Sequence, residues 1–216
     1  MEELSLVQMK PSDRERVVDF LLSEFTTQEP LNVAVGNRTP SRQGLDKFVP
    51  KDDISFCLMA IDSDNKIVGV GLYREIGPIY RPVRPVDPEA TPGQKIGTFL
   101  QIVENEAVKV IPGDLKRLLL GDILCIAAEY TRKGLGERMH YRVVDLAVKA
   151  GIDGLWGIQT NRKSQRMGDK LGLQVLTVVK HMDFKDSAGN VIFNCLDGTD
   201  CARVGFRSLR KPRAKL

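Results

Sequence analysis

The segment from residue 118 to residue 150 constrains the fold most strongly, because an apolar strand runs through a glycine-bearing turn directly into a long helix. Residues 118–127 are apolar apart from Gly121-Asp122, which is typical of a central strand buried on both faces. Gly134 and Gly136 follow in the turn. The next apolar residues recur at helical spacing, and they are Leu135, Met139, Val143, Leu146, Ala147 and Ala150. The pattern predicts a strand, a tight turn and a helix over 134–150.

A turn of this kind gathers free backbone N–H groups at the positive end of a helix dipole, where phosphate binds without side-chain charge. Gly134 and Gly136 lack a Cβ and would let a diphosphate approach the main chain, while Arg132 and Lys133 add charge at the rim. Alternatively, the glycine pair only caps the turn, and a bare Gly-x-Gly leaves both interpretations open. The dinucleotide-binding fingerprint does not fit, because its third glycine and its acidic residue about twenty positions later are missing.

The rest of the chain predicts a mixed α/β fold, since strands alternate with helices in the second half. We expect strands over 4–9, 55–61, 66–76, 155–160, 174–184 and near 204–209, and further helices over 11–26, 98–110 and 161–171. Ser12 and Glu15 have the spacing of a capping box, and Asn161 has the place of an N-cap. Residues 77–97 are rich in proline and glycine and predict either a mobile lid or a disordered insert.

Composition and length limit the partners. The 216 residues are 42% hydrophobic and 28% charged, as in one globular domain spanning 1–216, and the net charge of +4 fits an anionic small ligand at least as well as nucleic acid. We therefore expect no nucleic-acid or membrane partner, and a monomer or weak dimer. A basic tail is interpreted as a solvated terminus rather than an RNA or membrane patch; it comprises Arg207, Arg210, Lys211, Arg213 and Lys215.

The sequence also predicts a cytoplasmic protein without a metal site. No signal peptide is recognised at the N-terminus, and no apolar run approaches the roughly 18 residues that would span a bilayer. The four cysteines are scattered without a Cys-x-x-Cys pair, and only two histidines are available as further metal ligands. These cysteines fit a reducing compartment.

Two motifs carry a resemblance to a known family. Residues 129–136, Glu-Tyr-Thr-Arg-Lys-Gly-Leu-Gly, resemble the acetyl-CoA pyrophosphate loop of the GNAT superfamily of N-acetyltransferases, with the motif Arg/Gln-x-x-Gly-x-Gly/Ala. Thr131 departs from the first motif position, which bears on a side-chain contact and not on the amide cradle. Residues 161–173 resemble the helix that flanks CoA and ends in Lys-Leu-Gly-Phe. The resemblance implies the GNAT fold, with acetyl-CoA bound by Ile126, Ala128, Thr131, Arg132, Lys133, Gly134, Leu135, Gly136, Asn161 and Ser164.

A third segment narrows the resemblance. Residues 25–32 are similar to the Glu-Pro-Leu-Asn segment of the insect-type arylalkylamine N-acetyltransferases, and the similarity extends over 114–136, 164–173, 182–185 and 204–206. It implies that Glu29 is the general base that takes a proton from the substrate ammonium. A partly buried carboxylate with a raised pKa would suit that role, because an ammonium has no lone pair with which to attack. The alternative is an exposed acid that ends a helix before Pro30.

The proton donor to the departing thiolate differs from that of many GNAT enzymes. Their tyrosine position is Gly168 here, whereas Ser164 and Thr160 match two hydroxyl residues of the insect-type site. Ser164 is thus the implied general acid, and Thr160 lies four residues before it. Alternatively, Ser164 is a first-turn residue that bonds the backbone. Gly168 in a helix interior indicates that something packs close to it.

These residues predict an acetyl-CoA-dependent N-acetyltransferase that acts on arylalkylamines such as dopamine, serotonin, tyramine or octopamine by direct transfer in a ternary complex. Alternatives within the enzyme class are a polyamine acceptor or a longer acyl donor, and outside it a CoA-binding protein without turnover. Cys125 as a covalent nucleophile is disfavoured, since a buried cysteine is far more often a small apolar residue. His140 and His181 are expected to be structural or exposed.

Overall fold

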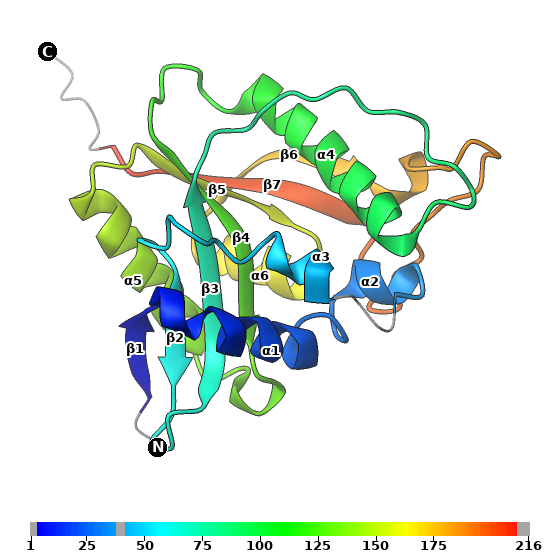
Figure 1. Cartoon of the computed structure of the whole chain (residues 1–216). Coiled ribbons are helices and arrows are strands. Elements are labelled where there is room, and N and C mark those ends of the chain that lie inside the picture. Colours follow the sequence, from blue (N-terminus) through cyan, green and yellow to red (C-terminus); the bar gives the residue numbers. More distant parts are fainter. Residues whose placement is uncertain (1–3, 38–41, 211–216) are drawn as a thin grey trace, which may run out of the picture.

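The computed structural model describes residues 4–37 and 42–210. A mixed sheet of seven strands in the order β1-β2-β3-β4-β5-β7-β6 forms its centre (Figure 1). Of the seven strands in the described part of the chain, only β4 and β5 pair in parallel, which confirms the predicted mixed α/β class. The strands are β1 (Ser5–Gln8), β2 (Leu58–Ile61), β3 (Ile67–Glu75), β4 (Leu118–Ile126), β5 (Gly154–Gln159), β6 (Gln174–Lys180) and β7 (Cys201–Ser208).

Helices cover both faces of the sheet. In the view of Figure 1, α1 and α4 lie in front of it and α5 and α6 lie behind it. The helices are α1 (Arg14–Glu24), α2 (Pro30–Ala34), α3 (Arg42–Asp46), α4 (Pro92–Val110), α5 (Leu135–Lys149) and α6 (Arg162–Lys170). On α5 the buried apolar residues are Leu135, Met139, Val143 and Ala147, so the predicted helical face is confirmed except at half-buried Leu146 and exposed Ala150.

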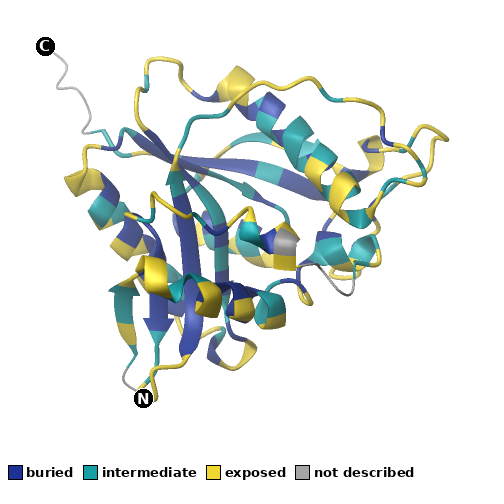
Figure 2. Ribbon diagram, in the orientation of Figure 1, coloured by how far each residue is buried: buried dark blue, intermediate teal, exposed yellow. Residues whose placement is uncertain are grey.

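The core is divided into two clusters, and burial is deepest along the central strands (Figure 2). One cluster joins α1 and α5 to β2, β3 and β4. The other joins α4 to β5 and β7, with the ring of Phe99 completely buried and about 5 Å from the rings of Phe184 and Phe193. Burying one such side chain stabilises a fold by about 1.5–3 kcal/mol. The central strands β4 and β5 are therefore packed against core residues from both clusters.

The start of the first helix differs from the prediction. Ser12 lies inside a short 3-10 turn (Pro11–Asp13), and Asp13 is the N-cap of α1. The side-chain bond back to the start of this turn comes from Asp13 and not from Glu15, since Asp13 Oδ2 accepts the Lys10 N–H at 2.9 Å. The predicted Ser12–Glu15 capping box is thus wrong, because the chain already turns after Lys10, the last extended residue, and Ser12 lies inside that turn.

The predicted extent of the proline- and glycine-rich segment, 77–97, is wrong. It includes the first six residues of α4, because Pro92 stands at the first helical position, where its missing N–H costs nothing. Thr91 caps the helix, accepting the Gln94 N–H while its own N–H donates to Gln94 Oε1 at 2.8 Å. Residues 77–91 remain without a helix or a strand and cross the outer face of α4 (Figure 1). We call them the strap.

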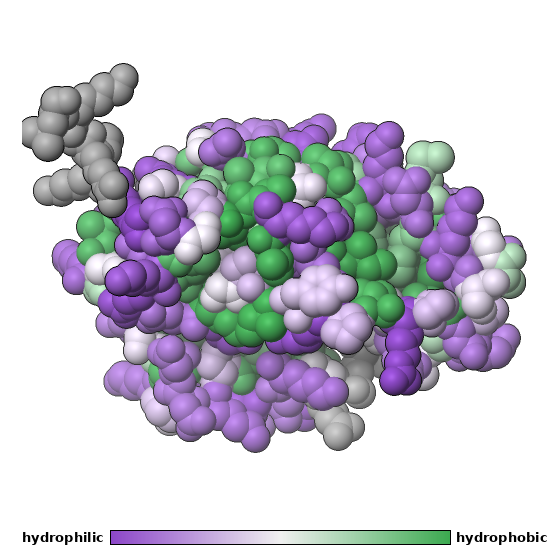
Figure 3. All heavy atoms as spheres, turned by 90° about the horizontal axis from the view of Figure 1, so that it is seen from above, coloured by the Kyte–Doolittle hydropathy of each residue, from purple (hydrophilic) through white to green (hydrophobic). Residues whose placement is uncertain are grey.

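The upper face of the molecule carries hydrophobic residues between polar ones (Figure 3). Among the exposed apolar side chains are Ile79 of the strap and Val108 and Val110 of α4. No helix in residues 4–37 and 42–210 has the length and apolar character needed to cross a membrane. In the basic tail, Arg210 forms ion pairs with Asp114 and Asp153, so it belongs to the folded surface. Lys211, Arg213 and Lys215 lie outside the described residues.

Candidate functional site

The two central strands separate where the site begins. β4 and β5 pair only from Leu118–Gly154 to Gly121–Gly157, although β4 continues to Ile126 and β5 to Gln159. A Cβ on Gly157 would lie 3.2 Å from the Gly121 carbonyl oxygen, so glycine permits the close approach at the last pair. Beyond it, the edge of β4 that faces β5 has main-chain groups without a partner strand. Such groups can bond a ligand's amide or carbonyl groups.

The predicted phosphate turn joins β4 to α5. Gly134 is the N-cap of α5, has φ +78°, and places no side chain over the first amides of the helix. A Cβ built on Gly134 would meet nothing within 4 Å, whereas one on Gly136 would lie 3.2 Å from Met167 Sδ of α6. Gly134 therefore leaves the end of the helix dipole open, and Gly136 allows α6 to approach α5. This open amide end fits a phosphate group.

The other residues of this turn have local roles as well. The Thr131 hydroxyl donates to the Ala128 carbonyl at 2.8 Å, and Arg132 has φ +61°. Lys133 Nζ lies 5.0 Å from the centre of the Tyr130 ring, a distance at which a cation–π interaction forms. The Ala128 N–H donates to Glu24 Oε2 at 3.2 Å. Ile126 ends β4 and is half-buried, and Leu135 begins α5 and is buried.

Glu29 is a buried carboxylate at the start of α2. Its side chain is only 7% exposed, Oε2 accepts the Asn32 N–H at 2.9 Å, and Oε1 accepts the Thr160 hydroxyl at 3.1 Å. Burial raises the pKa of Glu29, and the hydrogen bonds from Asn32 and Thr160 lower it by less. The alternative of an exposed acid is therefore wrong. Pro30, at the first position of α2, keeps Glu29 extended and turns its side chain back over the helix as the cap.

The structure brings Thr160, but not Ser164, to Glu29. Asn161 caps α6 as predicted, with Oδ1 accepting the Ser164 N–H at 2.9 Å. The Ser164 hydroxyl donates to the Asn161 carbonyl at 2.8 Å. This is the bond expected if Ser164 is a first-turn residue that bonds the backbone. Ser164 is half-buried, and within the described residues no bond joins it to Glu29 or Thr160. Its hydroxyl would have to turn to meet a ligand.

Gln159, the last residue of β5, is a buried polar residue next to Thr160 that no sequence motif singles out. Its side chain lies against α6, and a Cβ on Gly168 would fall 1.8 Å from Gln159 Nε2. A Cβ on Gly205 of β7 would lie 2.8 Å from the same atom, and Oε1 is buried without a hydrogen-bond partner. This explains why residue 168 has no side chain. The only sequence signal for Gln159 is that unexplained glycine.

A loop after β6 also reaches the site. The Arg162 N–H of α6 donates to Thr199 Oγ1 at 3.0 Å, and this hydroxyl donates to Asp197 Oδ2 at 2.6 Å. Burial acts to raise the pKa of Asp197, but hydrogen bonds from Thr199 and Arg162 together lower it. The Asp197 charge contributes to the raised pKa of Glu29. Asp197 therefore lies within electrostatic range of the Glu29 carboxylate.

The thiols and imidazoles are poorly placed for covalent chemistry. Burial raises the pKa of Cys125 to about 12, which keeps the thiol protonated. His140 and His181 are both buried, 4% and 3% exposed, which confirms a structural setting for them. Burial lowers the pKa of His140 to about 4, and His181 packs between Phe99 and Phe193.

No family model matches the chain. Solved structures are similar over nearly its whole length. A mosquito arylalkylamine N-acetyltransferase like 5b is 20% identical with a TM-score of 0.80, covering 95% of this chain and 100% of its own. A polyamine N-acetyltransferase of Drosophila melanogaster is 15% identical with a TM-score of 0.76, over 95% and 100%. The C-terminal condensation domain of Ebony, in complex with β-alanyl-dopamine, is 17% identical with a TM-score of 0.73, over 96% and 100%.

These likenesses establish the fold. The mixed seven-stranded sheet flanked by helices is the GNAT acetyltransferase fold expected from the sequence motifs. A condensation domain is similar to the chain as well, so the fold alone fixes neither an activity nor a substrate.

Proposed function

We propose that this chain, which has the GNAT fold, is an acetyl-CoA-dependent N-acetyltransferase whose acceptors are arylalkylamines. The observation that carries the proposal is the buried Glu29 carboxylate with its raised pKa and its bond to Thr160 beside the separated strands. A base of this kind can remove a proton from an ammonium near neutral pH.

The turn before α5 has the features needed to hold acetyl-CoA. The open Gly134 and the uncapped amides of α5 would bind the pyrophosphate, with Arg132 and Lys133 at the rim and the edges of Ile126, Ala128, Thr131, Leu135 and Gly136 beside it. Asn161 and Ser164 would lie along the thioester arm. Acetyl-CoA supplies an acetyl group activated as a thioester.

Each protein group then has a defined task. Glu29 takes a proton from the amine, and Thr160 keeps the carboxylate oriented toward the acceptor. Main-chain N–H groups on the free edge of β4 hold the carbonyl oxygen, where negative charge develops. Ser164 gives up its bond to Asn161 and donates a proton to the sulfur as the C–S bond breaks and the N–C bond forms. The second proton that the nitrogen loses as it becomes an amide restores the Ser164 hydroxyl.

Three alternatives define the test. The similarity to a polyamine N-acetyltransferase makes agmatine and the polyamines the main competing acceptors. The likeness to a condensation domain in complex with β-alanyl-dopamine makes the transfer of an acyl group larger than acetyl the second alternative. A CoA-binding protein without turnover would need no buried base.

The test is release of free thiol from acetyl-CoA by the purified protein, with phenethylamine, tyramine, dopamine and serotonin compared with agmatine and spermidine. Hexanoyl-CoA replaces acetyl-CoA in a parallel series. The proposal expects the highest kcat/KM with an aromatic amine and acetyl-CoA. Preference for agmatine would overturn the acceptor class, and CoA binding without thiol release from any pair would overturn the activity.

A further inference from the structure

The strap over α4 is held at both of its ends. Asn105, which is buried, binds the main chain of Arg81 twice, accepting its N–H at 2.9 Å and donating to its carbonyl at 2.7 Å. At the other end, the Val86 carbonyl accepts the Ser187 N–H at 2.8 Å, and Lys95 Nζ donates to the Pro88 carbonyl at 2.9 Å. The residues between Arg81 and Val86 cross α4 between these two sets of bonds.

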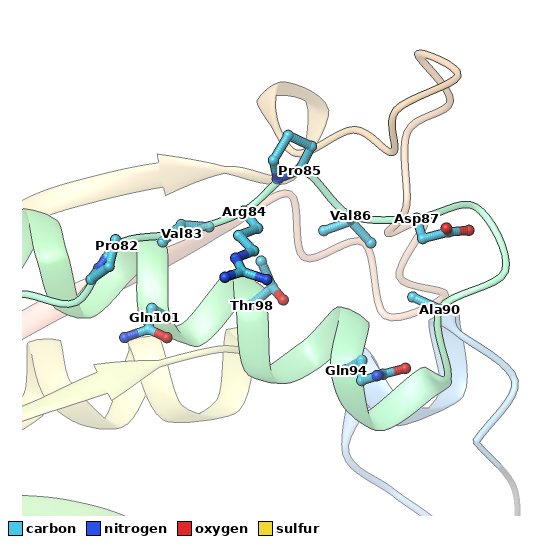
Figure 4. Close-up of a pocket in the computed structure, with 10 residues that line it drawn as sticks. All are labelled: Pro82, Val83, Arg84, Pro85, Val86, Asp87, Ala90, Gln94, Thr98 and Gln101. Carbon is cyan, nitrogen blue, oxygen red and sulfur yellow. The ribbon is translucent and has the colours of Figure 1, made fainter.

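A pocket of about 250 Å³ lies between the strap and α4. Its roof contains Pro82 and Pro85, whose rings fix the backbone φ and stiffen the bridge. Its floor is one polar stripe of α4, formed by Gln94, Thr98 and Gln101 at intervals of four and three residues. Figure 4 shows the Arg84 side chain extending from the roof toward Thr98 and Gln101.

The floor and the roof leave hydrogen-bond donors without partners. Within residues 4–37 and 42–210, Arg84 and the Thr98 hydroxyl make no hydrogen bond or ion pair, and Gln101 Nε2 is buried without a partner. The one acid in the lining, Asp87, accepts the Glu89 N–H through Oδ1 at 2.8 Å, and its carboxylate points away from Arg84 in Figure 4. An occupant beside Arg84 therefore meets the exposed guanidinium and the free donors of Thr98 and Gln101, with the Asp87 charge at the other end of the lining.

The walls indicate what else an occupant would carry. Pro82, Val83, Pro85, Val86 and Ala90 make much of the lining apolar. An inorganic anion would leave these walls without contacts, whereas an organic acid could place its body against them and its charge at Arg84. A planar guanidinium matches the two oxygens of a carboxylate.

We propose that this pocket is a binding site for a small organic monocarboxylate, with Arg84, Thr98 and Gln101 as its polar contacts. The site is distinct from the proposed acetyl-transfer site, because Thr98 and Gln101 face the strap while Phe99 and Val103 of the same helix are buried toward the sheet. Its test is independent of whether the chain acetylates amines.

The experiment is ligand-observed NMR by saturation transfer on the whole protein, with benzoate and hexanoate as probes and benzamide as the neutral comparison. Inorganic phosphate, which has no carbon-bound protons to observe, is added as a competitor of benzoate. We expect both carboxylates to receive saturation and benzamide to receive little. Arg84→Gln should weaken benzoate binding by about tenfold, as expected for a charge-assisted bond. Arg142→Gln, which changes an exposed arginine on α5, is the matched control and should leave binding unchanged.

Thr98→Val keeps the shape of the floor and removes one hydroxyl, so it should weaken benzoate binding by roughly threefold to tenfold. Circular dichroism and melting temperature establish that each variant is folded. The proposal is wrong if neither carboxylate binds, if benzamide binds as well as benzoate, or if folded Arg84→Gln binds benzoate like the wild type. Displacement of benzoate by phosphate at a lower concentration than hexanoate requires would overturn the carboxylate assignment.

Discussion

At the scale of single residues, Glu29 combines two opposing effects on one carboxylate. Burial raises its pKa, the bonds from Asn32 and Thr160 lower it, and burial is the larger effect. Glu29, the residue that the proposed chemistry needs, therefore lowers the stability of the fold when it is ionised. The reason is that a carboxylate is less stable in a buried position than in water.

We predict that Glu29→Ala lowers kcat by roughly 10²–10⁴-fold, since it removes the general base. Affinity for CoA, measured by calorimetric titration, should stay within about twofold of wild type because Glu29 is not part of the turn before α5. Activity of the wild type should rise with pH through the raised pKa of Glu29. A variant that turns over like the wild type across pH 6–9 would remove Glu29 from the mechanism.

Glu29→Gln tests the same residue through stability. The raised folded-state pKa means that the folded chain holds this proton more tightly than the unfolded chain, so ionisation destabilises the fold as pH rises. The neutral amide avoids that penalty and should raise the melting temperature at pH 8 by on the order of a few °C. The difference should shrink below the ordinary Glu pKa of about 4.3. An equal or lower melting temperature at pH 8 would show that the carboxylate is not penalised by burial.

At the scale of elements, the two helices behind the sheet depend on glycines for different reasons. Gly134 is required by its backbone, since φ is +78° and nothing occupies the space where a side chain would lie. Gly168 is required by its neighbour, since Gln159 fills that space. The sequence shows both as glycines near a helix and does not distinguish them.

Gly134→Asn and Gly134→Val separate occlusion of the turn from backbone strain. Asparagine tolerates the left-handed conformation, whereas a β-branched residue is strained there. Both side chains would occupy the open space beside the α5 amides, so we expect calorimetry to show CoA affinity lower by tenfold or more in each. Only Gly134→Val should also lose stability, by about 1–2 kcal/mol. Unchanged CoA affinity in Gly134→Asn would place the phosphates elsewhere.

Gly168→Ala should destabilise the fold although alanine favours a helix by about 1 kcal/mol over glycine. The new Cβ would overlap Gln159, which Gly205 confines on its other side, and overpacking costs about 1–3 kcal/mol. Gln159→Ala removes the obstacle, so Gly168→Ala should become neutral or stabilising in that background. The measurement is a double-mutant cycle by urea unfolding. Additive free energies would mean that the two residues do not compete for space.

Element prediction from sequence succeeded where periodicity is long and failed at prolines. β4, α5 and α6 have strong patterns and appear within a residue or two of their expected bounds. Pro30 is expected only to end a helix, and Pro92 falls in the proline- and glycine-rich segment 77–97, yet each stands at the first position of a helix. Thr91 and Gln94 have capping-box spacing, a signal hidden by the surrounding proline and glycine.

At the scale of the whole molecule, the site depends on contacts that local sequence does not encode. Thr160 and Glu29 are 131 positions apart, and their bond exists only because β5 ends where α2 begins. The family resemblance singles out both Thr160 and Glu29 but does not predict the bond between them. The spacing along the chain relates Thr160 only to Ser164, four residues later. Nor does the resemblance predict that the Ser164 hydroxyl donates to the Asn161 carbonyl.

The central claim is direct transfer between two substrates bound together, and the order of the kinetics tests it most directly. Initial rates over a range of acetyl-CoA concentrations at several fixed amine concentrations should give intersecting reciprocal plots. Cys125→Ala should retain most activity, because burial keeps this thiol protonated with a pKa of about 12. Parallel lines, with an acetylated protein formed in the absence of amine and activity abolished in folded Cys125→Ala, would contradict the mechanism.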